Sequence, residues 1–142
     1  MRQPATCEVL DYWNLLRGKR NAPDRDEVDP GAIRASLPDV FLLGFDAARR
    51  YPFRLAGMSV CALFGRELRD TSYITLWTAG AAPGMADLLQ SVVEDSTGAV
   101  VAVTGHNEVG QKLDLELLLL PLTCRGGERA RVLGALSAPC PP

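Results

Sequence analysis

The first part of the chain carries apolar residues at helical spacing. Val9, Trp13 and Leu16 recur every three or four positions, and Gly18 follows the last of them. This spacing predicts an amphipathic helix that ends at the glycine. Thr6 is the residue that we expect to cap its N-terminus, because a hydroxyl side chain accepts hydrogen bonds from the first turn.

The next part of the chain predicts a second, shorter helix followed by two strands. Asp29-Pro30 places a cap residue before a proline, which predicts a short helix ending near Leu37-Pro38. The apolar run Val40–Phe45 and the alternating stretch 51–56 predict two strands joined by a turn around residues 46–50. The alternation places the larger residues of the second strand on one face: Tyr51, Phe53 and Leu55.

The middle of the chain predicts helices of unequal length. Short apolar clusters within residues 59–77 are separated by Gly65 and by charged residues, which favours short helices and loops. Pro83 opens a longer helix, and Gly98 is expected to follow its end. The apolar face of this helix follows the i, i+3, i+4, i+7 rule: Met85, Leu88, Leu89, Val92 and Val93.

Three strand-like segments complete the chain, at residues 99–104, 112–123 and 130–137. Their connections are too short for crossover helices, so the strands are expected to be antiparallel. The order of elements therefore predicts an α+β domain with helices packed on one side of an antiparallel sheet. One face of the middle strand is predicted to be apolar: Leu113, Leu115, Leu117 and Leu119.

Composition narrows the class of protein. The chain has 142 residues, of which 47% are hydrophobic, so it has enough apolar side chain for the core of one domain. Its net charge of -2 is far from the basic balance of nucleic-acid-binding proteins. The longest apolar run, Leu117–Leu122, is far shorter than a membrane span, and the N-terminus lacks the apolar segment of a signal peptide. We expect a cytoplasmic protein with no nucleic-acid or membrane partner.

The four cysteines, Cys7, Cys61, Cys124 and Cys140, form no CxxC pair and have no nearby histidine. This spacing does not suit a zinc site, and we expect reduced thiols. The sequence also lacks a phosphate-binding loop, a nucleophile elbow and a zinc-protease motif. No residue is therefore assigned a catalytic or metal-binding role.

Two sets of residues suggest a family: the stretch from Arg54 to Leu68, and these further residues: Tyr12-Trp13, Leu16-Arg17, Pro23, Arg25, Asp29-Pro30, Phe53, Trp77, Leu119–Leu122 and Leu133–Leu136. By these residues and by its order of elements, the chain resembles a PAS domain, and more specifically the small bacterial PAS-domain proteins first catalogued as a family of unknown function. The resemblance covers roughly residues 8–137, and the stretch from Arg54 to Leu68 is its most specific part.

The resemblance implies a PAS fold, in which a five-stranded antiparallel sheet carries helices on one face, here with an added N-terminal helix. We expect an N-terminal helical extension over residues 1–38, the PAS core over 39–137 and a tail or truncated linker over 138–142. The family implies a non-enzymatic sensory or interaction domain in bacterial signal regulation. It also implies an interior that holds a small ligand in many members, with no cofactor assigned here. The candidate core or ligand-binding residues are Phe53, Arg54, Leu55, Leu63, Phe64, Trp77 and Leu117.

Two interpretations of the first helix stay open. Tyr12, Trp13 and Leu16 form an apolar stripe that either packs on the sheet or makes a homodimer interface, as N-terminal helices of PAS domains often do. A further signalling partner is expected in either case. The alternatives from other classes are a small cone-shaped α+β enzyme and a ligand-free scaffold.

Three polar residues suggest specific functional roles that can be weighed against structural ones. Cys61 lies where flavin-binding light sensors carry a reactive cysteine, but it lacks their Asn-Cys-Arg pattern, which favours a buried structural thiol. His106 is the only histidine, and its polar neighbours indicate an exposed hairpin tip. Arg54 interrupts an apolar strand, so we expect an ion pair with Glu67 or Asp70 in preference to an anionic ligand.

Overall fold

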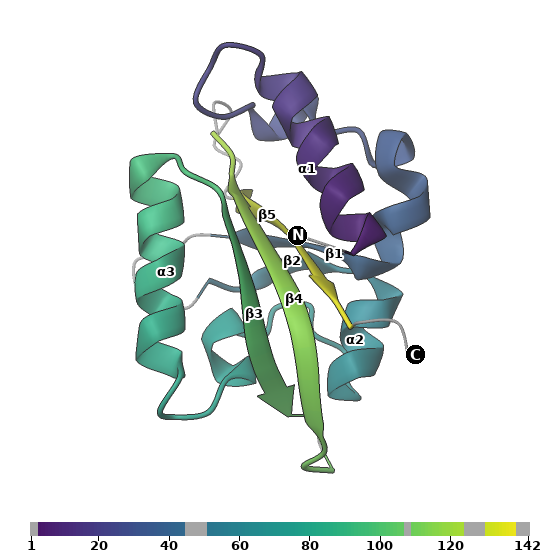
Figure 1. Cartoon of the computed structure of the whole chain (residues 1–142), viewed down its shortest axis with the longest axis vertical. Coiled ribbons are helices and arrows are strands. Elements are labelled where there is room, and N and C mark those ends of the chain that lie inside the picture. The colour runs from purple at the N-terminus through teal and green to yellow at the C-terminus, as the bar shows by residue number, and fades with distance from the viewer. Residues whose placement is uncertain (1–2, 45–50, 107–108, 124–129, 139–142) are drawn as a thin grey trace.

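The five strands form one antiparallel sheet in a computed structural model, which describes residues 3–44, 51–106, 109–123 and 130–138. Their spatial order is β2-β1-β5-β4-β3 (Figure 1). Every neighbouring pair is antiparallel, which confirms the predicted α+β class. The strand bounds are β1 Val40–Gly44, β2 Phe53–Ala56, β3 Ala99–His106, β4 Lys112–Pro121 and β5 Ala130–Ser137.

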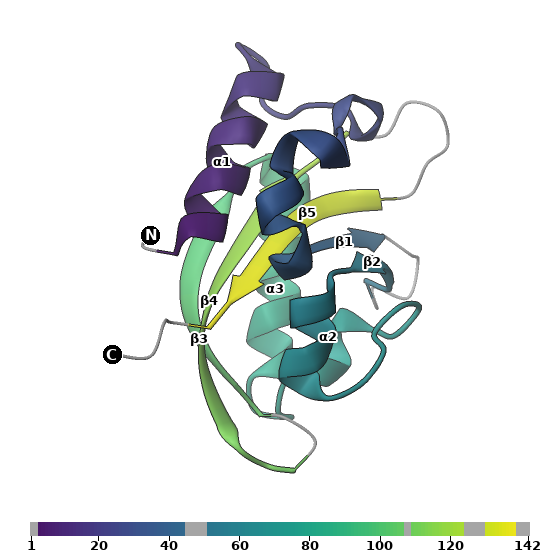
Figure 2. The same cartoon turned by 90° about the vertical axis from the view of Figure 1, so that its right-hand side faces the viewer.

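Helices cover both faces of this sheet. On the inner face lie α2, η3 and α3, while α1 and the 3₁₀ segment η2 lie on the outer face (Figure 2). The short segment η1 links α1 to η2. The helix bounds are α1 Pro4–Arg17, η1 Arg25–Glu27, η2 Pro30–Asp39, α2 Met58–Phe64, η3 Tyr73–Leu76 and α3 Ala82–Asp95.

Strand β4 explains why both faces are covered. Its alternate residues Leu115, Leu117 and Leu119 pack into the inner cluster, as the sequence predicts. The intervening residues Leu118 and Leu120 are equally buried, but on the outer face beneath α1. A run of leucines on both faces of one strand demands a layer on each side, because leaving either face in water would expose a large apolar area.

The ends of α1 correct one expectation. The helix begins at Pro4, with Gln3 as the N-cap residue, and Thr6 is fully buried inside the first turn. Proline suits this position because it has no N–H to leave unsatisfied, and the Gln3 N–H donates to Glu116 Oε2 at 3.0 Å. The C-terminal prediction is confirmed, since Gly18 caps the helix with a φ of 58°.

The other predicted caps have mixed outcomes. Asp29 caps η2 as expected, because its Oδ1 accepts a hydrogen bond from the Gly31 N–H at 3.0 Å. Helix α3 ends at Asp95, so Gly98 follows its end as expected, but Ser96 and not the glycine adopts the left-handed conformation of the C-cap. The turn predicted at residues 46–50 lies outside the described residues.

A β-bulge corrects the predicted alternation in β2. Leu43 pairs with Phe53 and Leu42 pairs with Leu55, so Arg54 is an extra residue opposite no partner in β1. The bulge shifts the side-chain alternation by one position. Phe53 is buried in the inner cluster, whereas Leu55 lies on the outer face and is 42% exposed. The sequence pattern therefore assigned Leu55 to the wrong face.

A substitution at Gly134 of β5 tests how closely the central strands pack. It pairs with Phe41 across the sheet, and a Cβ at Gly134 would overlap the phenyl ring. We expect Gly134→Ala to lower the free energy of unfolding by about 1–3 kcal/mol, because the ring has to leave its position. Urea denaturation measures the change.

Two further variants make this test specific. Adding Phe41→Leu to Gly134→Ala should recover part of the loss, since the smaller side chain vacates the overlap. Gly84→Ala in α3 is the control, because a Cβ there meets nothing within 4 Å. Equal destabilisation by the Gly84 and Gly134 substitutions would contradict the proposed overlap.

Candidate functional site

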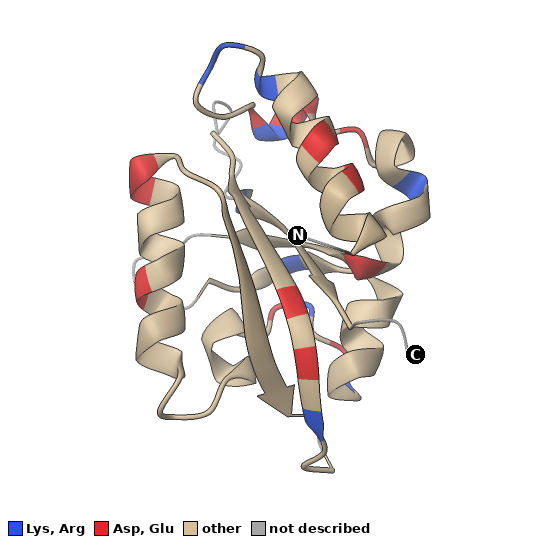
Figure 3. Cartoon of the chain, viewed as in Figure 1, with Lys and Arg blue, Asp and Glu red and all other residues tan. Residues whose placement is uncertain are grey.

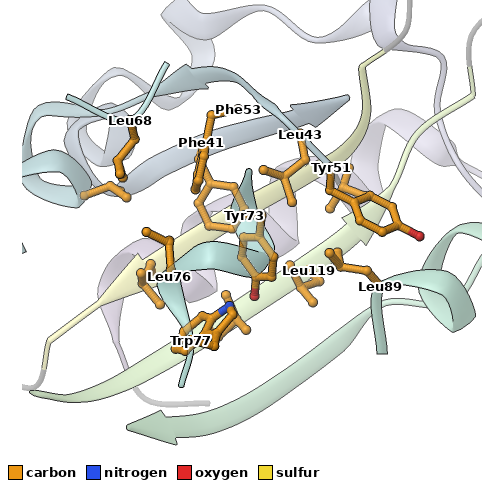
Figure 4. Packing of buried hydrophobic residues seen from close by; sticks show 14 of the residues in the cluster. Phe41, Leu43, Tyr51, Phe53, Leu68, Tyr73, Leu76, Trp77, Leu89 and Leu119 are labelled. Atoms are coloured by element: carbon orange, nitrogen blue, oxygen red, sulfur yellow. The ribbon is translucent and has the colours of Figure 1, made fainter. Parts of the chain in front are cut away.

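Five aromatic rings fill the space between the inner face of the sheet and the small helices. Phe41 and Phe53 make an edge-to-face pair with ring centroids 5.7 Å apart, and Tyr73 lies 6.0 Å from each of them (Figure 4). Trp77 lies 5.6 Å from Tyr73 and 6.4 Å from Phe64. These separations are typical of directly packed aromatic side chains.

Hydrogen bonds of η3 hold two of these rings in place. The Ser72 hydroxyl accepts from the Ile74 N–H at 3.2 Å and caps this short segment. The Tyr73 N–H donates to the Tyr51 carbonyl at 3.1 Å, and the Trp77 N–H donates to the Ile74 carbonyl at 3.3 Å. The backbone therefore fixes where both side chains enter the interior.

The polar groups of this aromatic cluster are neutral. Burial raises the pKa of Tyr73 well above its ordinary value, and the neighbouring Trp77 indole opposes that shift only in part. The Tyr73 hydroxyl and the Trp77 Nε1 lie next to each other, yet neither completes a hydrogen bond of normal geometry with a described residue. The arrangement offers hydrogen bonds to a ligand and no group that exchanges a proton near neutral pH.

The structure brings together four of the seven candidate residues. Phe53, Phe64, Trp77 and Leu117 are buried in the inner cluster. Leu63 packs against the edge of that cluster and also lines a separate polar pocket. Arg54 and Leu55 lie elsewhere because of the bulge in β2. Sequence reasoning missed Phe41 and Tyr73 as candidates, although both lie at the centre of the aromatic cluster.

The prediction that Arg54 forms an ion pair with Glu67 or Asp70 is wrong. Arg54 is exposed and forms no ion pair with any residue that the structure describes. The bulge leaves its side chain in water, where a lone guanidinium has no need of a partner. Glu67 instead faces the Cys61 thiol, whose Sγ lies 3.7 Å from its Oε1.

Cys61 and His106 have different surroundings from those of catalytic residues. Cys61 is half-buried in α2, less than we expected, and its Sγ also lies 4.0 Å from the Ala56 carbonyl. His106 is exposed at the end of β3, in register with Lys112. Asp114 is exposed as well, and Glu108 lies outside the described residues. His106 therefore does not supply the buried imidazole that the enzyme alternative needs.

Most of the apolar stripe of α1 makes contacts within the chain itself. Trp13 is only 6% exposed, and its Nε1 donates to the Pro121 carbonyl at 2.9 Å. The Tyr12 hydroxyl accepts from the Asp29 N–H at 2.7 Å, and Leu16 is half-buried. Packing on the sheet is thus the role of Trp13 in this structure.

A polar pocket of about 490 Å³ lies between the start of α1 and the ends of η2 and β5. Burial raises the pKa of the Asp39 carboxyl there, and the nearby Ser59 and Ser137 side chains lower it in part. Among the described residues, no group of three or more His, Cys, Asp or Glu side chains could hold a metal ion. The described helices include none that is long and apolar enough to span a membrane.

Solved structures with the same fold include sensory proteins. The LOV protein of Rhodobacter sphaeroides has 16% identity and a TM-score of 0.57, over 70% of this chain and 57% of that one. A PAS domain from Colwellia psychrerythraea has 14% identity and a TM-score of 0.57, over 78% and 97% of the two chains. The light state of the Aureochrome1 LOV photoreceptor has 13% identity and a TM-score of 0.58, over 77% and 87%.

These likenesses establish the fold alone, given the low identities. The chain spans less than two thirds of the Rhodobacter LOV protein. No curated protein matches the sequence. A family model described as the PAS domain matches residues 1–137, which is nearly the whole chain. The order of strands and helices agrees with this match. The chain therefore belongs to the PAS domain family.

Proposed function

We propose that this PAS domain is a non-enzymatic sensory and interaction module of bacterial cytoplasmic signal regulation. The observation that carries the proposal is the family match over residues 1–137. The surroundings of His106 and the neutral interior supply no acid–base pair among the described residues, which supports binding over catalysis. Charges of both signs are spread over the view in Figure 3, which agrees with the expectation of no nucleic-acid partner.

Protein contacts are the means of signalling that the packing favours. Aromatic rings occupy the inner face, so a ligand contacting Phe53, Phe64, Trp77 and Leu117 would have to displace some of them. Such a ligand would find the Tyr73 hydroxyl and the Trp77 N–H as hydrogen-bond partners. The outer surface needs no such rearrangement, and it carries exposed apolar residues.

The proposed homodimer contact lies on α1. Because Trp13 and Tyr12 are engaged within the chain, the contact uses the neighbouring exposed surface of the helix. Leu15 is 79% exposed there, next to the half-buried Leu16. An exposed leucine on a helix that already packs against the sheet is suited to pair with a second copy of the same helix.

Native mass spectrometry of the protein purified without added ligand tests the contact. We expect a dimer for the wild type and a folded monomer for Leu15→Glu, because a buried carboxylate pair at the contact would be costly. Val109→Glu is the matched control, since Val109 is also an exposed aliphatic residue, at 81%, but lies between β3 and β4. A monomeric wild type, or equal dissociation by both variants, would refute the α1 contact.

An absorbance spectrum tests whether the chain shares the flavin chemistry of light-sensing PAS domains. We expect no flavin bands and no change on illumination, because Val60 and Ala62 flank Cys61 and its thiol faces Glu67. The sample is incubated with flavin mononucleotide and desalted before the spectrum is recorded. A retained flavin signal that bleaches in light, and fails to bleach in Cys61→Ala, would show that the expectation is wrong.

A further inference from the structure

An apolar groove of about 420 Å³ lies on the outer face of the sheet. Its floor is formed by Leu42, Leu55 and Leu133 of β1, β2 and β5, and one wall is formed by η2. The start of α2 closes another side, and Figure 2 shows η2 beside β1, β2 and α2. The volume is within the range of roughly 300–1,000 Å³ of small-molecule sites. This groove is separate from the aromatic cluster on the inner face.

The β-bulge and the backbone of η2 create the groove. The bulge at Arg54 turns Leu55 outward, opposite Leu42, and α1 covers β4 and β5 rather than β2. The backbone of η2 leaves helical geometry at Ile33, so η2 is not a straight helix lying across the strands. Gly57 packs directly on the Leu37 and Pro38 carbonyls, where a Cβ would not fit, and this contact fixes one end of the groove.

Two arginines border this apolar surface. Arg25 and Arg34 both line the groove, and neither forms an ion pair with a described residue. Their positive charges lie beside an apolar floor, an arrangement that suits a ligand with an apolar body and an anionic end.

The acidic residues near Arg25 are engaged elsewhere. The Asp24 carboxylate accepts from the Asp26 N–H at 3.1 Å and from the Thr123 hydroxyl at 3.1 Å. Glu27 pairs with Arg20, with 2.7 Å between Glu27 Oε1 and Arg20 Nη1. The Asp29 carboxylate accepts from the Gly31 N–H. These contacts leave the two guanidinium groups available for an external anion.

We propose that this groove binds a free amphiphilic carboxylate, of the medium-chain fatty acid class. Its hydrocarbon chain lies on Leu42, Leu55 and Leu133, and its carboxylate accepts hydrogen bonds from Arg25 and Arg34. A neutral hydrocarbon would leave both guanidinium groups without an anionic partner, and a cationic amphiphile would be repelled by them. A strongly polar anion would have no use for the apolar floor. The proposal adds a ligand site to the sensory function and does not depend on the oligomeric state.

Calorimetric titration with decanoate, below its micelle concentration, tests the proposal. We expect saturable binding of one decanoate per chain. Decanol and decyltrimethylammonium, which carry the same chain on neutral and cationic headgroups, should bind at least about tenfold more weakly, since each lacks the charge-assisted hydrogen bonds. Equal affinity for the three headgroups, or binding that does not saturate, would overturn the assignment.

Variants locate the site. Arg34→Gln should weaken decanoate binding about tenfold or more, and because Arg34 is exposed the substitution removes no core packing. Leu55→Asn should weaken it similarly by placing an amide on the groove floor. Arg69→Gln is the matched control, because Arg69 is exposed and does not line the groove. If Arg34→Gln and Leu55→Asn bind decanoate as Arg69→Gln does, the groove is not the site.

The same variants distinguish other occupants of the groove. If Leu55→Asn converts a dimer into a monomer while the wild type fails to bind decanoate, a second copy of the chain covers the groove and the proposal is wrong. If the wild type fails to bind free decanoate but sediments with phosphatidylglycerol vesicles, the surface docks on a membrane and the proposal is again wrong. The membrane result would leave the α1 contact untouched, whereas a dimer formed through the groove would compete with it, and Leu15→Glu then shows whether α1 takes part.

Discussion

The ring of Phe41 rests on Gly134 at the centre of the sheet, and the rest of the fold depends on this contact. Glycine is required there because a Cβ would occupy the space of the ring. The ring can then lie close to β5 and present its edge and face to Phe53 and Tyr73. Those two residues come from β2 and η3, so one close approach joins the sheet to the small helices that cover it.

This packing determines which face of the sheet is open to a ligand or a partner. The inner cluster, including Trp77 and Leu89, packs the helices tightly on the sheet. The outer layer is less complete, because α1 covers β4 and β5 but not β2. Leu55 of β2 and Met58 at the start of α2, which is 84% exposed, stay in contact with solvent. The incompletely covered face therefore offers exposed apolar surface to a ligand or a partner. The proposed α1 contact and the proposed groove both belong to that outer layer.

Sequence reasoning succeeded where a pattern was long and local. The inward-facing leucines of β4 and the apolar face of α3 were each predictable, because each set recurs at a regular spacing within one continuous segment. The bulge at Arg54 was not predictable, because it is defined by pairing with β1 rather than by residues within β2. Without the bulge, the sequence pattern placed Leu55 on the wrong face of the sheet and assigned Arg54 an ion pair that it does not form. Tyr73 was missed because η3 spans only four residues and shows no period. The groove has no sequence signature, since its lining comes from segments far apart in the chain.

Native-state amide hydrogen exchange tests most directly whether the aromatic cluster closes the inner face. The Tyr73 and Trp77 amides, which donate to Tyr51 and Ile74, report on the small helices, and the Phe41 amide reports on the sheet. If the cluster is closed, we expect the Tyr73 and Trp77 amides to be protected to within about tenfold of Phe41, because both layers then open only together. Exchange of Tyr73 and Trp77 orders of magnitude faster than Phe41 would show that the small helices open away from the sheet, and would contradict the account.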